Sequence, residues 1–156
     1  MDNEDKQYWC KEGEKKEKRF VETNKVIGWD IVMNPGKVFD KYAFDLTSAC
    51  PCDLKTQETQ WDLSYEMFGI PSEQAVTLNQ KDLRRYYRLY PNIIILFDVK
   101  HLGKVFMLTL SRAEKLIKQE KAHLHTYKKR VNDQKGNAKA SYIFDVNDLD
   151  ELRLGE

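Results

Sequence analysis

The chain has 156 residues, of which 41% are apolar and 33% charged; this composition is typical of a folded domain with a core and excludes a disordered chain. Its 26 basic and 25 acidic residues leave a net charge of +1, so total charge does not predict a nucleic-acid partner. The longest apolar run, residues 93–97, is far too short to cross a bilayer, and the polar start of the chain is not a secretory signal. We therefore expect one soluble domain over residues 1–156, in the cytoplasm of a cell or of an infected host.

The three cysteines, Cys10, Cys50 and Cys52, do not predict a structural site. An odd number that includes one Cys-Pro-Cys string is not a disulfide framework. The string also lacks the spacer of zinc sites, and the chain is one cysteine short of a four-cysteine site. We expect no structural zinc, and the pattern fits a reducing compartment.

The first third of the chain predicts a helix followed by three strands. Residues 5–24 combine a charged stretch with a few apolar positions, as surface helices do. Strands are predicted over residues 28–33, which end at the turn sequence Asn-Pro-Gly, and over residues 42–47. Residues 48–49 are expected to turn the chain, and residues 52–57 to run back as the third strand.

The rest of the chain predicts helices alternating with strands. Residues 58–76 are hard to assign, but Thr77 can cap a helix over residues 78–89. Residues 92–99 are a continuous β-branched run, which predicts a strand buried on both faces. The remaining expectations are a strand at 105–110, a helix at 112–120 capped by Ser111, a polar loop at 121–139, a strand at 141–145 and a helix or turn at 146–154. This order predicts an α/β fold with a central mixed sheet flanked by helices.

Two aspartates and a lysine on the second and third predicted strands form the strongest candidate site. If the strands make a tight hairpin, Asp53 and Lys55 share a face, because side chains alternate along a strand, and Asp45 can project to the same place. Neighbouring carboxylates repel each other unless a cation lies between them, and hard oxygen ligands suit Mg²⁺. Such a centre can activate water and stabilise charge on a phosphodiester. The ordinary interpretation is an exposed strand pair with a solvated Asp45.

The string Asp53-Leu54-Lys55-Thr56-Gln57, with Asp45 upstream, resembles the D…(D/E)-x-K core of the PD-(D/E)XK nuclease superfamily, in particular its small phage-type members. That superfamily includes restriction endonuclease-like and Holliday junction resolvase-like proteins. The resemblance implies a restriction endonuclease-like αβββαβ core, which matches the predicted element order through residue 100 and covers two thirds of the chain. Gln57 resembles the glutamine that often follows the lysine in this superfamily.

The resemblance also points to an acidic residue on the first helix. Residues 13–20 are similar to a frequent G-x-x-x-E-x-x-F form, which implies Glu17, with Glu14 and Glu22 as rivals. The chain departs from the usual pattern because Phe44 replaces proline before Asp45. Because Asp45 and Asp53 are only eight positions apart, the turn between them must be tight, and Asp40 is the alternative to Asp45.

The resemblance implies a metal-dependent endonuclease that hydrolyses DNA, in phage or mobile-element DNA processing. Glu17, Asp45 and Asp53 would hold Mg²⁺ or Mn²⁺, Lys55 would orient water or hold the phosphate, and Gln57 would lie beside them. A homodimer is compatible with this, because many such nucleases cut two strands as dimers. Because some superfamily members have lost catalysis, the alternative is an inactive nucleic-acid-binding or interaction protein that keeps the nuclease fold.

Basic residues cluster near the end of the chain and on one predicted helix. Residues 121–140 hold six basic residues and one acidic residue, and either grip a phosphate backbone or form an ordinary solvated loop. The predicted DNA contacts in this segment are Lys128, Lys129, Arg130, Lys135 and Lys139. A second basic face is predicted at Lys81, Arg84, Arg85 and Arg88, which recur at helical spacing. Trp61, Tyr65 and Phe68 are expected to be core or lid residues rather than base-stacking platforms.

Overall fold

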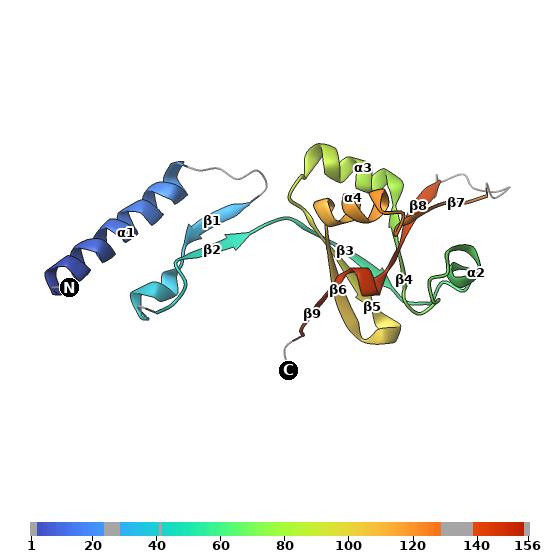
Figure 1. The fold of residues 1–156 in the computed structure, drawn as a ribbon, viewed down its shortest axis with the longest axis horizontal. Coiled ribbons are helices and arrows are strands. Elements are labelled where there is room, and N and C mark those ends of the chain that lie inside the picture. Colours follow the sequence, from blue (N-terminus) through green and yellow to red (C-terminus); the bar gives the residue numbers. More distant parts are fainter. Residues whose placement is uncertain (1–2, 24–28, 41, 129–138, 155–156) are drawn as a thin grey trace. The chain divides into compact units, whose positions relative to one another are not determined.

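The structure is a computed structural model that describes residues 3–23, 29–40, 42–128 and 139–154. Its internal contacts divide the chain into an N-terminal unit, residues 1–50, and a C-terminal unit, residues 51–156, each described here by itself (Figure 1). The described residues form a mixed α/β protein with four α-helices and three sheets. The α/β class is thus confirmed, but these strands do not form the single central sheet that we expected. The single domain over residues 1–156 stays a prediction.

The N-terminal unit consists of one long helix and a two-stranded antiparallel sheet. Its elements are α1 (Asn3–Thr23), β1 (Asp30–Met33), the 3-10 helix η1 (Pro35–Val38) and β2 (Leu46–Ala49). The predicted helix is confirmed, but the strand predicted at 42–47 begins only at Leu46 and continues to Ala49. The Asn34 side chain accepts from the Gly36 N–H at 3.0 Å and donates to the Phe44 carbonyl at 2.8 Å, which holds the segment before β2 as a loop. Residues 48–49, expected to turn, pair with Asp30 and Ile31 of β1.

The C-terminal unit contains two sheets, with strand orders β3-β5-β6-β9 and β4-β8-β7 (Figure 1). Only β3 and β5 pair in parallel among its described strands, and the other pairs are antiparallel. Its strands are β3 (Cys52–Gln57), β4 (Ala75–Asn79), β5 (Ile94–Val99), β6 (Lys104–Thr109), β7 (His123–Thr126), β8 (Ala140–Asp145) and β9 (Asp150–Leu152). Its helices are α2 (Ser64–Phe68), α3 (Gln80–Leu89), α4 (Leu110–Lys118) and the 3-10 helices η2 (Lys100–Leu102) and η3 (Val146–Asp148).

Several predicted boundaries differ from the structure for local reasons. Thr77 does not cap a helix, because it pairs with Ile143 inside β4, and α3 begins only after Asn79. Thr109, and not Ser111, caps α4 by accepting from the Arg112 N–H at 3.2 Å. Strand β7 lies within the predicted polar loop and pairs with β8, the next strand along the chain. Strand β9 lies within the predicted terminal helix or turn and pairs with β6, which is distant in sequence.

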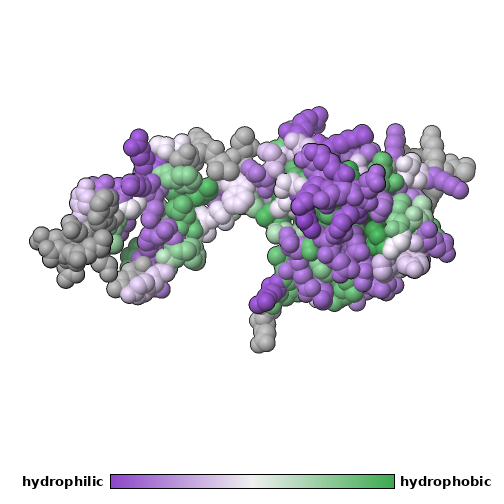
Figure 2. All heavy atoms as spheres, viewed as in Figure 1, coloured by the Kyte–Doolittle hydropathy of each residue, from purple (hydrophilic) through white to green (hydrophobic). Residues whose placement is uncertain are grey.

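The apolar core belongs to the C-terminal unit. Every buried residue in the described part of the chain lies between positions 64 and 149, and the main cluster joins α3 and α4 to both sheets. Ile95, Phe97 and Val99 of β5 are buried, whereas the residues between them are half-buried, so only one face of this strand is fully covered. Hydrophilic side chains spread over the outer surface of α3 and α4 (Figure 2). None of the described helices has the length and apolar character that a bilayer span requires.

Candidate functional site

Strand β3 places Asp53, Lys55 and Gln57 on one face. These three side chains are half-buried, while the side chains that alternate with them are exposed. Asp53 lies opposite Ile95 and Lys55 opposite Phe97 in the parallel pairing with β5. The polar face of β3 is therefore the continuation of the buried face of β5, and the predicted shared face of Asp53 and Lys55 is confirmed.

Lys55 lies between two carboxylates that come from different elements. Its Nζ is 2.9 Å from Oδ2 of Asp53 on β3 and 2.9 Å from Oδ2 of Asp82 on α3. Only 17% of the Asp82 side chain and 27% of the Lys55 side chain are exposed. An amine with two acidic partners this far from solvent is more constrained than a surface ion pair. We call Asp53, Lys55 and Asp82 the acid–lysine cluster.

Two further residues of α3 hold the carboxylates in place. The buried Tyr86 donates its phenolic O–H to Oδ2 of Asp53, and Arg85 Nη2 lies 3.1 Å from Oδ1 of Asp82. The Arg85 guanidinium carbon also lies 5.2 Å from the centre of the Tyr86 ring. Because residues three and four apart share a helix face, one face of α3 supplies an acid and both supporting groups.

The pKa of Lys55 is raised above its ordinary value of 10.5. Burial lowers this pKa, but the hydrogen bonds to Asp53 and Asp82, together with their charges, raise it by more. Lys55 is therefore an ammonium group at neutral pH, able to donate hydrogen bonds and unable to accept a proton.

Gln57 lies on the same face of β3 but has a different partner. Its Nε2 donates to the Ala75 carbonyl at 2.6 Å, which ties β3 to the start of β4. This bond fixes the orientation of the amide without bringing it to either carboxylate. Gln57, two positions after the lysine of the motif, therefore links strands β3 and β4.

Asp45 and Glu17 meet a different lysine within the N-terminal unit. Lys37 of η1 pairs with Oδ1 of Asp45 and lies 3.0 Å from Oε2 of Glu17. Asp45 precedes β2, which pairs with β1, whereas β3 pairs with β5. The tight hairpin that we expected between the second and third strands is therefore wrong. Asp40, the alternative to Asp45, accepts from the Tyr42 backbone N–H at 2.9 Å and stabilises a turn.

The donor set of the acid–lysine cluster suits a hard divalent cation. Mg²⁺ binds through one or two carboxylates and completes its shell with water and substrate phosphate oxygens. Asp53 and Asp82 provide two such carboxylates, and in this structure the Lys55 amine lies between them. No group of three or more His, Cys, Asp or Glu side chains gathers anywhere in the described ranges, so further ligands would come from water and substrate.

The predicted basic residues are partly described. Lys128 and Lys139 are exposed at the ends of β7 and β8, whereas Lys129, Arg130 and Lys135 lie outside the described residues. The second basic face is exposed on α3 as its helical spacing predicted, at Lys81, Arg84, Arg85 and Arg88. Both described sets are accessible to a polyanion.

Sequence reasoning missed Asp82 and Tyr86. Both lie in a segment correctly expected to be helical, on the face that also carries the buried Leu83. Asp82 lies beside Leu83 and Tyr86, two apolar residues at helical spacing, and this pattern indicates a carboxylate at the edge of the buried face. Such a half-buried carboxylate needs a hydrogen-bonding or charged partner. That signal does not name the partner, which depends on the strand that α3 packs against.

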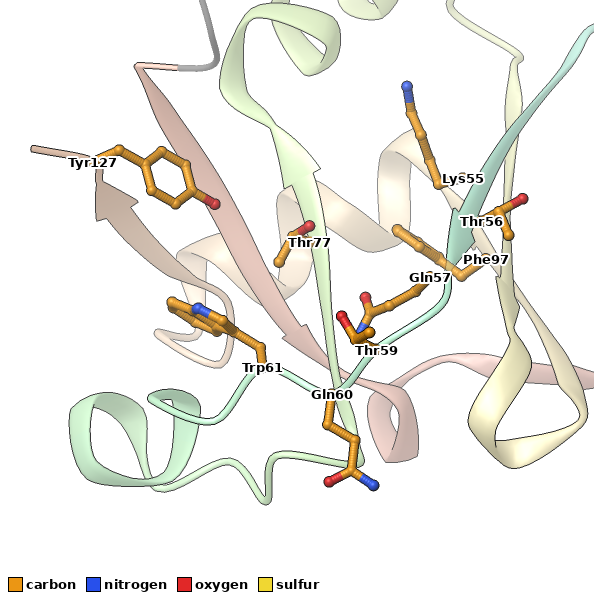
Figure 3. Close-up of a pocket in the computed structure, with 9 residues that line it drawn as sticks. All are labelled: Lys55, Thr56, Gln57, Thr59, Gln60, Trp61, Thr77, Phe97 and Tyr127. Atoms are coloured by element: carbon orange, nitrogen blue, oxygen red, sulfur yellow. The ribbon is translucent and has the colours of Figure 1, made fainter. Parts of the chain in front are cut away.

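A hollow of about 310 Å³ opens beside Lys55. Lys55 and Gln57 of β3 and Thr77 of β4 line it together with the rings of Trp61 and Tyr127 (Figure 3). The hollow therefore connects the acid–lysine cluster with an aromatic surface.

Comparison with known proteins adds a structural likeness. No family model matches the chain, and no curated protein matches it. Among solved structures, the chain is similar to a nuclease from a fusselovirus, with a TM-score of 0.44 and 12% identity over 97% of this chain and 89% of that chain.

Proposed function

We propose that this protein is a magnesium-dependent nuclease that hydrolyses DNA phosphodiester bonds. The observation that carries the proposal is the acid–lysine cluster, in which Asp53, Lys55 and Asp82 converge beside an open hollow. The D-x-K string of the PD-(D/E)XK superfamily, Asp53-Leu54-Lys55, supplies two of the three residues.

In this proposal Asp53 and Asp82 would hold the metal ion, which would supply a bound water of lowered pKa and positive charge beside the phosphate. Lys55 is held protonated by its acidic partners, so it serves as a cationic donor to a phosphate oxygen and not as the base. Tyr86 acts as a positioning residue, because its hydroxyl fixes one oxygen of Asp53. The chemistry is therefore divided between an ion that activates water and an amine that stabilises charge.

The sequence-based assignment of Glu17 and Asp45 as further ligands remains part of the proposal. The proposed contacts to the DNA backbone are Lys128, Lys129, Arg130, Lys135 and Lys139. A homodimer that cuts both strands is likewise a proposal.

Cleavage of labelled DNA by the full chain in Mg²⁺ or Mn²⁺ tests the function. We expect Asp53→Asn and Lys55→Ala each to lower the rate by about 100-fold or more, because each removes a group that stabilises the transition state. The chain offers a matched control in Asp98 and Lys100, which form a second D-x-K pair with Nζ and Oδ2 2.6 Å apart. Asp98→Asn and Lys100→Ala should cut normally.

Circular dichroism and thermal unfolding confirm that each variant is folded. Normal cleavage by both Asp53→Asn and Lys55→Ala, or an equal loss in the control pair, contradicts the mechanism.

One observation favours a second candidate, a non-catalytic nucleic-acid-binding protein. The Lys55 ammonium already lies between the two carboxylates, where a metal ion would bind. Such a protein would bind DNA with steep salt dependence and no metal requirement. Calorimetric titration with Mn²⁺ separates the candidates, because only the nuclease should release heat that Asp53→Asn abolishes.

A further inference from the structure

The hollow beside Lys55 has an aromatic side and a polar side. Trp61 and Tyr127 lie on one side, Lys55 on the other, and Thr77 between them (Figure 3). Its volume of about 310 Å³ is at the low end of small-ligand sites. A space of this size suits one planar ring system with its attached sugar.

The aromatic side is a connected set of rings. The Trp61 and His125 ring centres are 5.2 Å apart, and those of His125 and Tyr127 are 4.8 Å apart, both edge to face. Behind them, Phe68 stacks on His123 with centres 4.9 Å apart. Because each ring is held by its neighbour, Trp61 and Tyr127 present preorganised surfaces to the hollow. Trp61 and Phe68 pack against a small core cluster, as expected of core or lid residues. Trp61 also lines the hollow.

Polar groups near the rings can read the edge of a base. Gln57 is oriented by its hydrogen bond to the Ala75 carbonyl, and Thr77 places a hydroxyl in the middle of the hollow (Figure 3). Amide and hydroxyl groups hydrogen-bond both donors and acceptors, so they accept several bases. The site is thus suited to a base without being restricted to one.

Lysine residues lie on both sides of the hollow, and of these Lys55 is paired with Asp53 and Asp82. Lys55 lines the hollow, and Tyr127 is joined to the basic segment, because its N–H donates to the Lys139 carbonyl at 3.0 Å and Lys128 follows it in sequence. A nucleotide with its base against the rings would have cationic groups near the phosphates that flank it.

We propose that this hollow receives the base of an unpaired nucleotide, so that the protein selects DNA with single-stranded positions. In a duplex both faces of each base are covered by its neighbours, and only an unstacked base exposes a face to Trp61 or Tyr127. This inference rests on the proposed function for the identity of the polymer. It adds the class of substrate: flaps, gaps, branches or single strands, rather than continuous duplex.

The test uses the full chain in EDTA, which prevents cleavage. The probe is a single-stranded oligothymidylate with one 2-aminopurine and a terminal dye, and a blunt duplex is the comparison. We expect the protein to quench the 2-aminopurine and to bind the single strand at least tenfold more tightly than the duplex. Tyr127→Leu and Trp61→Leu should each weaken single-strand binding by about fivefold or more and remove the quenching, because each deletes a stacking surface.

Tyr65→Leu is the matched control, since Tyr65 is a 65% exposed aromatic residue on α2 that does not line the hollow. It should bind and quench like the unchanged protein. Trp61 also packs against a small core cluster around Ile70, so Tyr127→Leu keeps the test valid if the tryptophan variant does not fold. Equal affinity for both DNAs without quenching, or full quenching by Tyr127→Leu, overturns the inference.

Failure of the inference and failure of the proposed function give different results. Asp53→Asn should keep the quenching and lose cleavage. If Asp53→Asn still cleaves in Mg²⁺, the catalytic proposal fails, whereas the binding result in EDTA is unaffected. If Asp53→Asn is inactive but the unchanged protein does not discriminate between the two DNAs, the catalytic proposal stands and the base pocket is wrong.

Discussion

Each unit of this protein contains a lysine between two carboxylates, and the two arrangements differ in their surroundings. In the N-terminal unit, Lys37 pairs with Glu17 and Asp45, and 56% of the Asp45 side chain is exposed. In the C-terminal unit, Lys55 pairs with Asp53 and Asp82 beside the buried Tyr86. The two arrangements therefore differ mainly in one carboxylate, because the Asp45 side chain is 56% exposed and that of Asp82 only 17%. The side chains of Lys37 and Glu17, each 22% exposed, are as shielded from solvent as that of Lys55.

The difference follows from where each unit keeps its apolar residues. The described part of the N-terminal unit has no buried side chain, so no apolar core fixes the positions of its charges. In the C-terminal unit, α3 buries Leu83 and Tyr86 and holds Asp82 over β3. Similar charge pairs are thus more useful for binding and catalysis where a core fixes their positions.

The largest expected contrast is between two phenylalanines. Phe144 of β8 is fully buried in the main core cluster, whereas Phe39 in the N-terminal unit is 91% exposed. Phe144→Ala should lower the free energy of unfolding by about 3–5 kcal/mol, because it removes buried area and leaves a cavity. Phe39→Ala should change it by about 0.5 kcal/mol or less. Urea unfolding measures both, and similar losses in the two variants would contradict the division.

A smaller effect is expected at two adjacent tyrosines of α3. Tyr86 donates to the Asp53 carboxylate, and Tyr87 donates to the Leu110 carbonyl at 3.2 Å. Tyr86→Phe should lower the free energy of unfolding by about 1.5–3 kcal/mol, because the hydrogen-bond acceptor of Tyr86 is charged. Tyr87→Phe should lower it by about 0.5–1.5 kcal/mol, because the acceptor of Tyr87 is a neutral carbonyl. Chemical denaturation of the two variants shows which substitution lowers the stability more. A greater cost for Tyr87→Phe would show that Tyr86 does not support Asp53.

The pKa of each of the two lysines should fall when one of its acidic partners is removed. The pKa of each is raised above 10.5, Lys37 chiefly by its hydrogen bonds to Asp45 and Glu17, and Lys55 by Asp53 and Asp82 against the effect of burial. Asp82→Asn should lower the pKa of Lys55, and Asp45→Asn that of Lys37. NMR titration of the lysine ¹³Cε signals measures each value. A Lys55 pKa unchanged by Asp82→Asn would contradict the cluster.

The raised pKa of Lys55 also predicts a pH dependence of stability. A lysine whose pKa is raised by folding stabilises the folded state fully below the unfolded value of 10.5, and this stabilisation is lost as pH rises through the folded pKa. Unfolding free energy measured across that alkaline window should fall more steeply in the unchanged protein than in Asp82→Asn. Equal slopes would show that the pairing does not contribute.

The smallest expected difference is in salt dependence. At about 1 M salt the screening length falls to about 3 Å, and exposed pairs are screened more than partly buried ones. The pKa of Lys37 should therefore move toward its ordinary value more than that of Lys55. The same NMR titration in high salt detects this, and a larger change at Lys55 would reverse the comparison.

Local patterns predicted β3 and the shared face of Asp53 and Lys55, because strand alternation depends only on neighbouring residues. They could not predict that Asp82 and Tyr86 reach this face, because that depends on how α3 packs across β3. The boundaries of β2 were missed because its start depends on Asn34, whose side chain bonds to the Phe44 carbonyl. Strand β4 was not predicted, and its last two residues were expected to be helical, because its pairing with β8 is distant in sequence.

The position of α3 in the chain has a consequence for how this sequence can change. Asp82, Arg85 and Tyr86 reach the cluster from one helix face, so one residue inserted between Gln80 and Asp82 would rotate them by about 100° relative to the start of the helix. Related chains should therefore keep the spacing from β4 through α3 constant.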